Sequence, residues 1–196
     1  QEFYTEKYGV VHPTKAGLKI PEIFDAAINK EVKALWIIGE DVVQTDPNSA
    51  HVVKAMNALD LLVVQEIFMS ETAKHADVVL PGTTFLEKDG TFTNTERRVQ
   101  RVNKAAEPLP GTKPDGVIVT EMMQKLGYNQ PMYDADEVLA EIADVVPFFK
   151  GITRERLGKL GLQWPVKEDG TDTKILHEKE FKLGKGRIKY FDWKES

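Results

Sequence analysis

Three short apolar runs decide the fold of this chain: ALWII at positions 34–38, LLVV at 61–64 and VVL at 78–80. Each run is apolar without polar alternation, which is typical of strands that are covered on both faces. A glycine follows the first run at position 39, where the chain is expected to leave the sheet. The region from 34 to 80 is therefore predicted to contain three buried strands.

Helical patterns separate these runs. Val52, Met56 and Leu59 lie four and three residues apart, which places them on one face of a helix over residues 49–59. A second, shorter helix fits residues 70–75, with Ser70 as its cap. The order strand, helix, strand, helix, strand predicts a parallel sheet with right-handed crossovers.

The rest of the sequence predicts a helical, loop-rich extension after the α/β region. We expect residues 1–130 to form the α/β region and residues 131–196 to form the extension. Residues 81–114 are rich in Gly, Thr, Asn and Pro, and we interpret them as a long functional loop. Further helices are predicted at residues 21–29, 115–126, 136–145 and 154–160, and a strand at residues 187–191.

Composition excludes several classes of chemistry. The 196 residues include no Cys, so the chain has no disulfide, thiolate zinc site, cysteine-held iron–sulfur cluster or cysteine nucleophile. A net charge of −5 argues against a main role in binding nucleic acid or anionic lipid. No stretch approaches the roughly 20 apolar residues of a membrane helix. The four His residues show no metal-ligand spacing and no Gly-x-Ser-x-Gly motif occurs, so we predict neither a metal ligand nor a catalytic residue.

Polar residues follow the ends of the apolar runs. Asp41 follows the first run, and Gln65 and Glu66 follow the second. Ligands of parallel sheets bind at the carboxyl ends of the strands, where such side chains can accept hydrogen bonds from ribose or guanine. From position alone, helix capping and solvated turns are the favoured interpretation.

Two further segments carry charge. Lys88, in the loop at 87–94, can neutralise a phosphate, although an ordinary charged turn explains it equally well. The arginines at 97, 98 and 101 can face phosphates or acidic partners. A solvated edge strand over 96–102 is the favoured interpretation of this second segment.

Several segments, in this order and spacing, resemble the molybdopterin oxidoreductases, and among them the catalytic alpha subunits of formate dehydrogenases. The resemblance runs from about residue 33 to the end of the chain. The segments are WIIGED at 36–41, VQEIF at 64–68, ADVVLP at 76–81, EKDGTFTNTERRVQ at 87–100 and GLQWP at 161–165.

The resemblance implies a role for five residues. It places Asp41, Gln65, Glu66, Lys88 and Asp115 at a molybdopterin guanine dinucleotide, with Lys88 suited to the pyrophosphate. The family usually has Asp where this chain has Glu66, whose side chain is longer by one methylene, so the resemblance leaves the exact contact of Glu66 open. The cofactor implied for the intact enzyme is a molybdenum or tungsten bis(molybdopterin guanine dinucleotide), and the reaction is formate to carbon dioxide.

The family's iron–sulfur site, a 4Fe-4S cluster held by cysteines, and its cysteine or selenocysteine metal ligand have no counterpart here. We therefore expect an internal segment of a larger subunit, without its final β-barrel domain, that is inactive and binds no cofactor alone. Its expected partners are the remaining domains, iron–sulfur electron-transfer subunits and formate. We expect a cytoplasmic location, with the periplasm as the alternative.

Two other interpretations stay open. The segment can come from another member of the superfamily, such as a nitrate reductase or the iron–sulfur subunit of NADH dehydrogenase. It can also be a stand-alone nucleotide-binding or interaction module that keeps the fold without redox chemistry.

Overall fold

The computed structural model describes residues 2–167, 169–181, 184 and 186. The α-helices are α1 (Glu2–Tyr8), α2 (Ile20–Ile28), α3 (Val42–Thr45), α4 (Ser49–Ala58), α5 (Asp115–Lys125), α6 (Ala135–Val145) and α7 (Arg154–Leu157). The strands are β1 (Ala34–Ile38), β2 (Leu61–Glu66), β3 (Val78–Pro81), β4 (Gly90–Thr93), β5 (Arg98–Val102) and β6 (Leu162–Gln163). Three short 3₁₀ helices are η1 (Ala73–His75), η2 (Phe85–Glu87) and η3 (Pro147–Phe149).

The predicted parallel sheet is confirmed. Strands β1, β2 and β3 lie in that order and run parallel, with Leu35 beside Leu62 and Val64 beside Val79. The α/β fold class is therefore correct. The predicted 70–75 helix is shorter, because only η1 forms there, and the Ser70 hydroxyl accepts a 3.2 Å bond from the Ala73 N–H.

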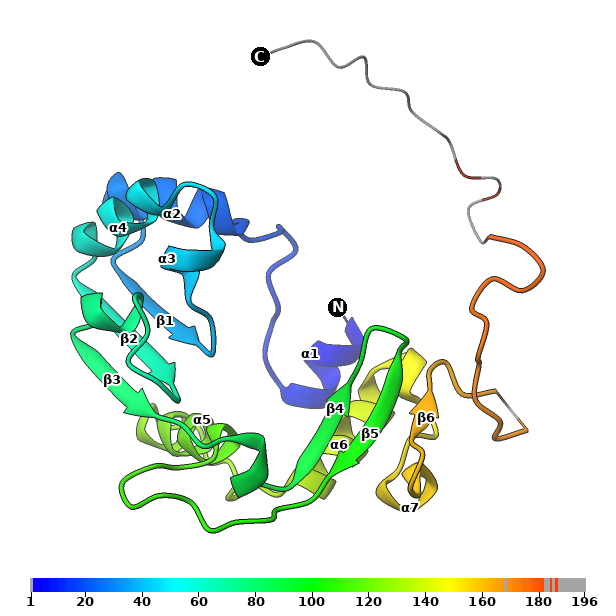
Figure 1. The fold of residues 1–196 in the computed structure, drawn as a ribbon. Helices are drawn as coiled ribbons and strands as arrows, with labels where there is room; N and C mark the ends of the chain where they lie inside the picture. The colour runs from blue at the N-terminus through cyan, green and yellow to red at the C-terminus, as the bar shows by residue number, and fades with distance from the viewer. Residues whose placement is uncertain (1, 168, 182–183, 185, 187–196) are drawn as a thin grey trace.

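Helices cover one face of this sheet. Leu62 and Val64 of β2 are fully buried against α2 and α4, whose Phe24, Val52 and Met56 belong to the same core. Figure 1 shows α2, α3 and α4 gathered on one side of the strands. On the opposite face, Ile38, Leu61 and Val78 are 47%, 42% and 43% exposed. These three residues lie at strand ends, whereas Gln65 on the same face is 1% exposed, so the expectation that both faces are covered is met only in part among the described residues.

A second, antiparallel sheet lies where a long loop is predicted. Strands β4 and β5 form a hairpin, and β6 pairs with β5 through Arg98 beside Gln163. Strand β5 is therefore the central strand of this sheet and not the edge strand that its charge pattern suggests. The interpretation of residues 81–114 as a long loop is likewise wrong, because β4 and β5 lie within this range.

The hairpin has its own core. Val99 of β5 is fully buried with Leu139 of α6, Ile152 and Leu157. This core combines residues from both sides of position 130. The division of the chain into 1–130 and 131–196 stays a prediction. The predicted strand at 187–191 lies outside the described residues.

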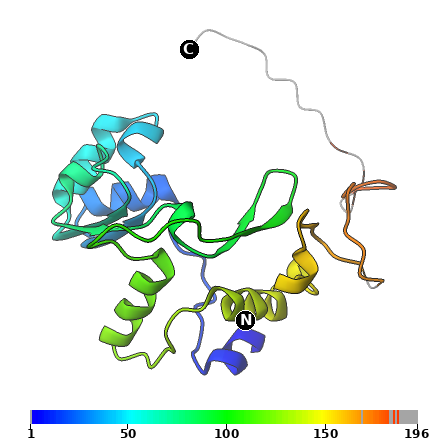
Figure 2. The ribbon, with the colours of Figure 1, turned by 60° about the horizontal axis from the view of Figure 1, so that its bottom comes forward.

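Helix α1 lies beside α6 although the two are far apart in sequence (Figure 2). The Tyr4 hydroxyl donates to the Val145 carbonyl at 3.2 Å, and the Tyr8 hydroxyl donates to Glu141 Oε1 at 2.6 Å. The Glu141 hydrogen bond is the main reason that the pKa of Tyr8 rises to about 12. These bonds hold the N-terminal helix against the second part of the fold.

Adjacent leucines of β2 test the one-sided packing. Leu62 is 1% exposed in the core and Leu61 is 42% exposed on the other face. We expect Leu62→Ala to lower the free energy of unfolding by about 2–5 kcal/mol, because it leaves a cavity. Leu61→Ala is the matched control and should cost less than about 1 kcal/mol. Urea unfolding followed by circular dichroism measures both, and an equal or larger loss for Leu61→Ala would contradict the assigned face.

Candidate functional site

The carboxyl ends of the three parallel strands meet at one edge of the sheet. Gln65 and Glu66 end β2, Pro81 ends β3, and Asp41 follows β1. Helix α5 begins beside this edge, at Asp115. Residues from distant parts of the sequence therefore come together where parallel sheets bind ligands.

Three of the five predicted site residues form one hydrogen-bonded cluster, which we call the Gln65 cluster: Gln65, Lys88 and Asp115. Gln65 Nε2 donates to Asp115 Oδ1 at 2.7 Å. The Lys88 ammonium donates to Asp115 Oδ2 and, at 3.2 Å, to the carbonyl of Thr83. The cluster joins β2, the segment after β3 and the first turn of α5.

The cluster keeps the Asp115 carboxylate ionised. Partial burial favours the neutral form of Asp115, but hydrogen bonds from Lys88 and Gln65 and the charge of Lys88 outweigh burial. As a result the pKa of Asp115 lies below its ordinary value of 3.8. The ammonium of Lys88 has three N–H donors, and the contacts with Asp115 and Thr83 use two of them.

Two buried oxygens beside the cluster lack partners among the described residues. Gln65 Oε1 and Thr83 Oγ1 make no hydrogen bond, although Gln65 is 1% and Thr83 2% exposed. A buried polar atom without a partner costs free energy, so each oxygen favours a hydrogen-bonding group brought by a ligand or by water. This donor and acceptor set fits a polar group that carries N–H or O–H donors together with a phosphate.

Asp41 has a different set of contacts. Its Oδ1 accepts from the Thr72 amide at 2.9 Å and from the Thr72 hydroxyl at 2.6 Å, and its Oδ2 accepts from the Glu71 amide and Gln44 Nε2. Burial opposes ionisation, but these hydrogen bonds together hold the pKa of Asp41 below its ordinary value. Asp41 thus ties the loop after β1 to the loop after β2, and no bond between described residues joins it to the Gln65 cluster.

Glu66 also lies outside the Gln65 cluster. Its Oε1 accepts a 2.7 Å bond from the amide of Ile67, and its carbonyl accepts a 3.0 Å bond from Gly82. At Gly82 a Cβ would lie 3.1 Å from Asp115 Oδ1, so a larger residue would crowd the cluster. The structure thus joins Gln65, Lys88 and Asp115, while Asp41 and Glu66 make separate contacts on the same edge.

The structure adds residues that the sequence prediction missed. A cavity of about 180 Å³ opens beside Lys88 and Asp115, between β4 and the helices α5 and α6. Tyr133 lines it and packs so closely on α5 that a Cβ at Gly116 would lie 2.3 Å from the ring. Thr83 lies two residues after the end of β3, in the segment 81–84 that follows the third apolar run, and that position was its sequence signal. Tyr133 comes from a segment with no periodic pattern, so nothing in the local sequence indicated it.

Two structural findings concern metals and membranes. Within the described ranges, no group of three or more His, Asp or Glu residues could hold a metal ion. Among the same residues, no helix is long and apolar enough to cross a membrane.

A parallel sheet with polar side chains collected at its carboxyl edge is the arrangement of nucleotide-binding α/β proteins. Comparison with known families is more specific. Residues 9–125, more than half of the chain, match the family model named Molybdopterin oxidoreductase. The chain therefore belongs to the molybdopterin oxidoreductase family, whose name implies a molybdenum or tungsten pterin cofactor.

Individual relatives agree with this family. The chain is 46% identical over 179 residues to the F420-dependent formate dehydrogenase subunit alpha of Methanocaldococcus jannaschii, covering 90% of this chain and 26% of the relative. It is 42% identical over 189 residues to a Staphylococcus aureus (strain USA300) protein that is provisionally named a formate dehydrogenase. This match covers 96% of this chain and 19% of the relative. The chain thus spans about a quarter or less of these relatives.

A solved structure supports the fold. Acetylene hydratase from Pelobacter acetylenicus matches with a TM-score of 0.57 and 26% identity, over 70% of this chain and 20% of that one. The similarity confirms that the α/β arrangement described above is one that this family adopts.

The charge state of Asp115 gives a pH-dependent prediction. Because its pKa is lower in the folded chain, its contribution to stability is fully present above pH 3.8 and is lost as the pH falls through the folded pKa. We expect Asp115→Asn to lower the free energy of unfolding at pH 7 by about 1 kcal/mol, a small value because both partners are partly exposed. The difference from the unsubstituted chain should shrink at pH 3 and below.

Urea unfolding at pH 7 and pH 3 measures this difference. Glu31→Gln, at an exposed position with no side-chain partner among the described residues, is the matched control. A loss for Asp115→Asn that stayed constant between the two pH values would show that the carboxylate charge does not carry the effect.

Proposed function

We propose that this chain is part of a formate dehydrogenase-type oxidoreductase and that the carboxyl edge of its sheet helps to hold the guanine dinucleotide of the molybdenum or tungsten cofactor. The proposed reaction of the whole enzyme converts formate to carbon dioxide, one proton and two electrons. The bound cofactor supplies the two-electron redox chemistry. The electrons leave through iron–sulfur centres, which the Cys-free chain cannot itself provide.

The Gln65 cluster is the observation that carries this proposal. The third N–H of Lys88 is available to a pyrophosphate oxygen, while the other two stay with Asp115 and Thr83. The unpartnered Gln65 Oε1 suits an N–H or O–H donor, such as the amino group of guanine or a ribose hydroxyl. Asp115 fixes both side chains and so determines the direction in which they present these groups.

Asp41 and Glu66 have supporting roles in this proposal. Asp41 holds the loops after β1 and β2 in a fixed relation through Thr72. Glu66 keeps one carboxylate oxygen on the Ile67 amide, and its other oxygen is free of partners among the described residues. We therefore propose Asp41 as a positioning residue and Glu66 as a ribose or guanine contact.

The relatives favour formate as the substrate of the whole enzyme. Two of them carry formate dehydrogenase names at 42–46% identity. The structural neighbour, in contrast, is named a hydratase, so the fold by itself does not determine the reaction. We further propose that the remaining domains of the subunit and iron–sulfur subunits are the partners, in the cytoplasm.

Lys88→Met tests the cofactor contact in a full-length subunit that contains this chain. The substitution keeps the aliphatic stem and removes the charge, so we expect cofactor affinity to fall by about tenfold. Molybdenum or tungsten content and released pterin after dialysis measure retention. Lys54→Met, on the exposed face of α4, is the matched control and should retain the cofactor. Wild-type retention in a correctly folded Lys88→Met subunit would reject the assignment.

The activity of the chain by itself gives a second test. We expect the purified 196-residue chain to show no formate-dependent reduction of a dye, because it has no cysteine to hold a cluster. The full-length subunit, assayed in parallel, should reduce the dye. Turnover by the isolated chain after removal of all full-length enzyme would contradict the proposal.

A further inference from the structure

A groove of about 590 Å³ lies beside the second sheet, between β5 and the chain on either side of β6. Its charged and amide lining consists of Glu96, Arg98, Gln100, Lys159, Asp172 and Lys174. It shares no lining residue with the cavity beside Lys88 and Asp115. The groove is therefore a separate feature from the Gln65 cluster, and its volume falls in the range of roughly 300–1,000 Å³ found for small-molecule sites.

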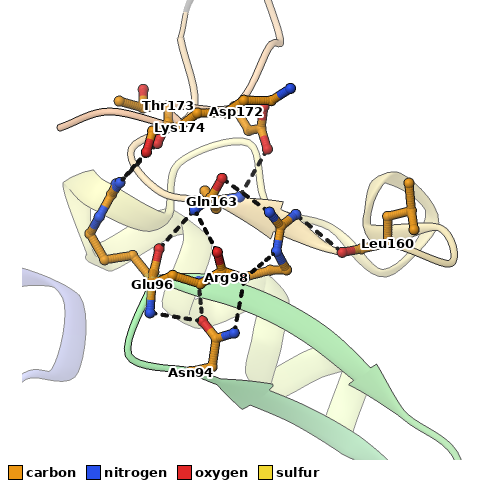
Figure 3. Close-up of polar contacts among 9 residues, drawn as sticks. Asn94, Glu96, Arg98, Leu160, Gln163, Asp172, Thr173 and Lys174 are labelled. Atoms are coloured by element: carbon orange, nitrogen blue, oxygen red, sulfur yellow. Dashed lines mark hydrogen bonds and ion pairs between the residues drawn. The ribbon is translucent and has the colours of Figure 1, made fainter. Parts of the chain in front are cut away.

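The floor of this groove is a fixed polar network (Figure 3). Gln163 is 5% exposed, and its Nε2 donates to the Glu96 carbonyl at 3.0 Å while its Oε1 accepts from an Arg98 guanidinium nitrogen at 3.1 Å. Arg98 also donates to Glu96 Oε1 at 2.8 Å and to the Leu160 carbonyl at 3.3 Å. The groove is thus held by bonds between residues more than sixty positions apart.

Gly161 determines how closely the loop before β6 approaches β5. A Cβ at this position would lie 2.3 Å from the carbonyl oxygen of Val99, and the residue has a φ of +73°. Only glycine meets both conditions without strain. The loop that carries Lys159 is therefore fixed close to β5.

The charges of the groove are not balanced. Glu96 already accepts from Arg98 and, at 3.1 Å, from Asn94, and Asp172 accepts from the Gln163 amide at 3.4 Å. The ammonium groups of Lys159 and Lys174 have no hydrogen-bond or ion-pair partner in the described part of the chain. The lining has three cationic side chains, Arg98, Lys159 and Lys174, and two carboxylates, Glu96 and Asp172, so it carries one net positive charge.

We propose that this groove binds a phosphate-bearing small molecule. Lys159 and Lys174 approach the phosphate from the loop before β6 and the segment after it, and the Gln100 amide donates from β5. Two flexible ammonium groups suit the diffuse charge of a phosphate, and the fixed Arg98–Gln163 floor limits the depth of the ligand.

Inorganic pyrophosphate is the probe for the first test. We expect ¹H–¹⁵N NMR of the 196-residue chain to show saturable shifts at Gln100, at 159–161 and at 172–174. A double Lys159→Met and Lys174→Met substitution should weaken binding by about tenfold or more, because each lost ammonium group removes one Coulomb attraction to the pyrophosphate. The matched control, Lys54→Met with Lys125→Met, removes the same charge from α4 and α5 and should bind as the unsubstituted chain does.

Glu96→Gln gives an effect of opposite sign. The substitution removes the competing negative charge beside Arg98, so pyrophosphate binding should become tighter by about three- to tenfold. Damage to the fold would weaken binding instead, so tighter binding cannot be explained by misfolding. Lys88→Met should leave the groove affinity unchanged. The proposal is overturned by an absence of saturable shifts, by unchanged binding in the double lysine variant, by weaker binding in Glu96→Gln, or by loss of binding in Lys88→Met. Binding of a polyglutamate peptide without binding of pyrophosphate would also overturn it and would identify an acidic protein segment as the ligand.

Discussion

The ion pair between Lys88 and Asp115 is the contact on which the arrangement of the candidate site depends. Asp115 is the first residue of α5, Lys88 lies after η2, and the Gln65 side chain bonds the same carboxylate from the end of β2. A partly buried pair gains little net stability, because desolvation offsets most of the attraction. Its main effect is geometric: it holds a cation and an amide oxygen at one edge of the sheet.

The second sheet depends on contacts of another kind. Arg97 adopts a left-handed backbone with a φ of 68°, which is unusual for a residue with a side chain, and it closes the β4–β5 hairpin. Its guanidinium donates to the carbonyl of Trp164 and, at 3.0 Å, to that of Thr173, and lies 5.6 Å from the centre of the Trp164 ring. The left-handed turn at Arg97 is thus stabilised by contacts with the chain that follows β6.

The sequence predicts those features that local pattern determines. The runs at 34–38, 61–64 and 78–80 became the parallel sheet, because a buried strand needs continuous apolar residues. Strand β5 was predicted as an edge because its partner β6 lies more than sixty residues later, and no local pattern encodes such a pairing. Asp41 and Lys88 show the same limit: a strand end locates Asp41 and the charged loop at 87–94 locates Lys88, but Thr72 and Asp115 determine what each side chain contacts.

The candidate site and the groove differ in the kind of polar group that has no partner. At the Gln65 cluster the buried oxygens of Gln65 and Thr83 lack partners within the described ranges, so a ligand there is expected to bring donors as well as a phosphate. In the groove the ammonium groups of Lys159 and Lys174 have no partner among the residues that the structure describes, so an anion alone satisfies them. Burial makes the first demand strict, because a buried oxygen without a partner costs free energy until a ligand or an ordered water supplies a donor. Solvent reaches the lysines, so the groove is expected to bind more weakly and to lose affinity as salt increases.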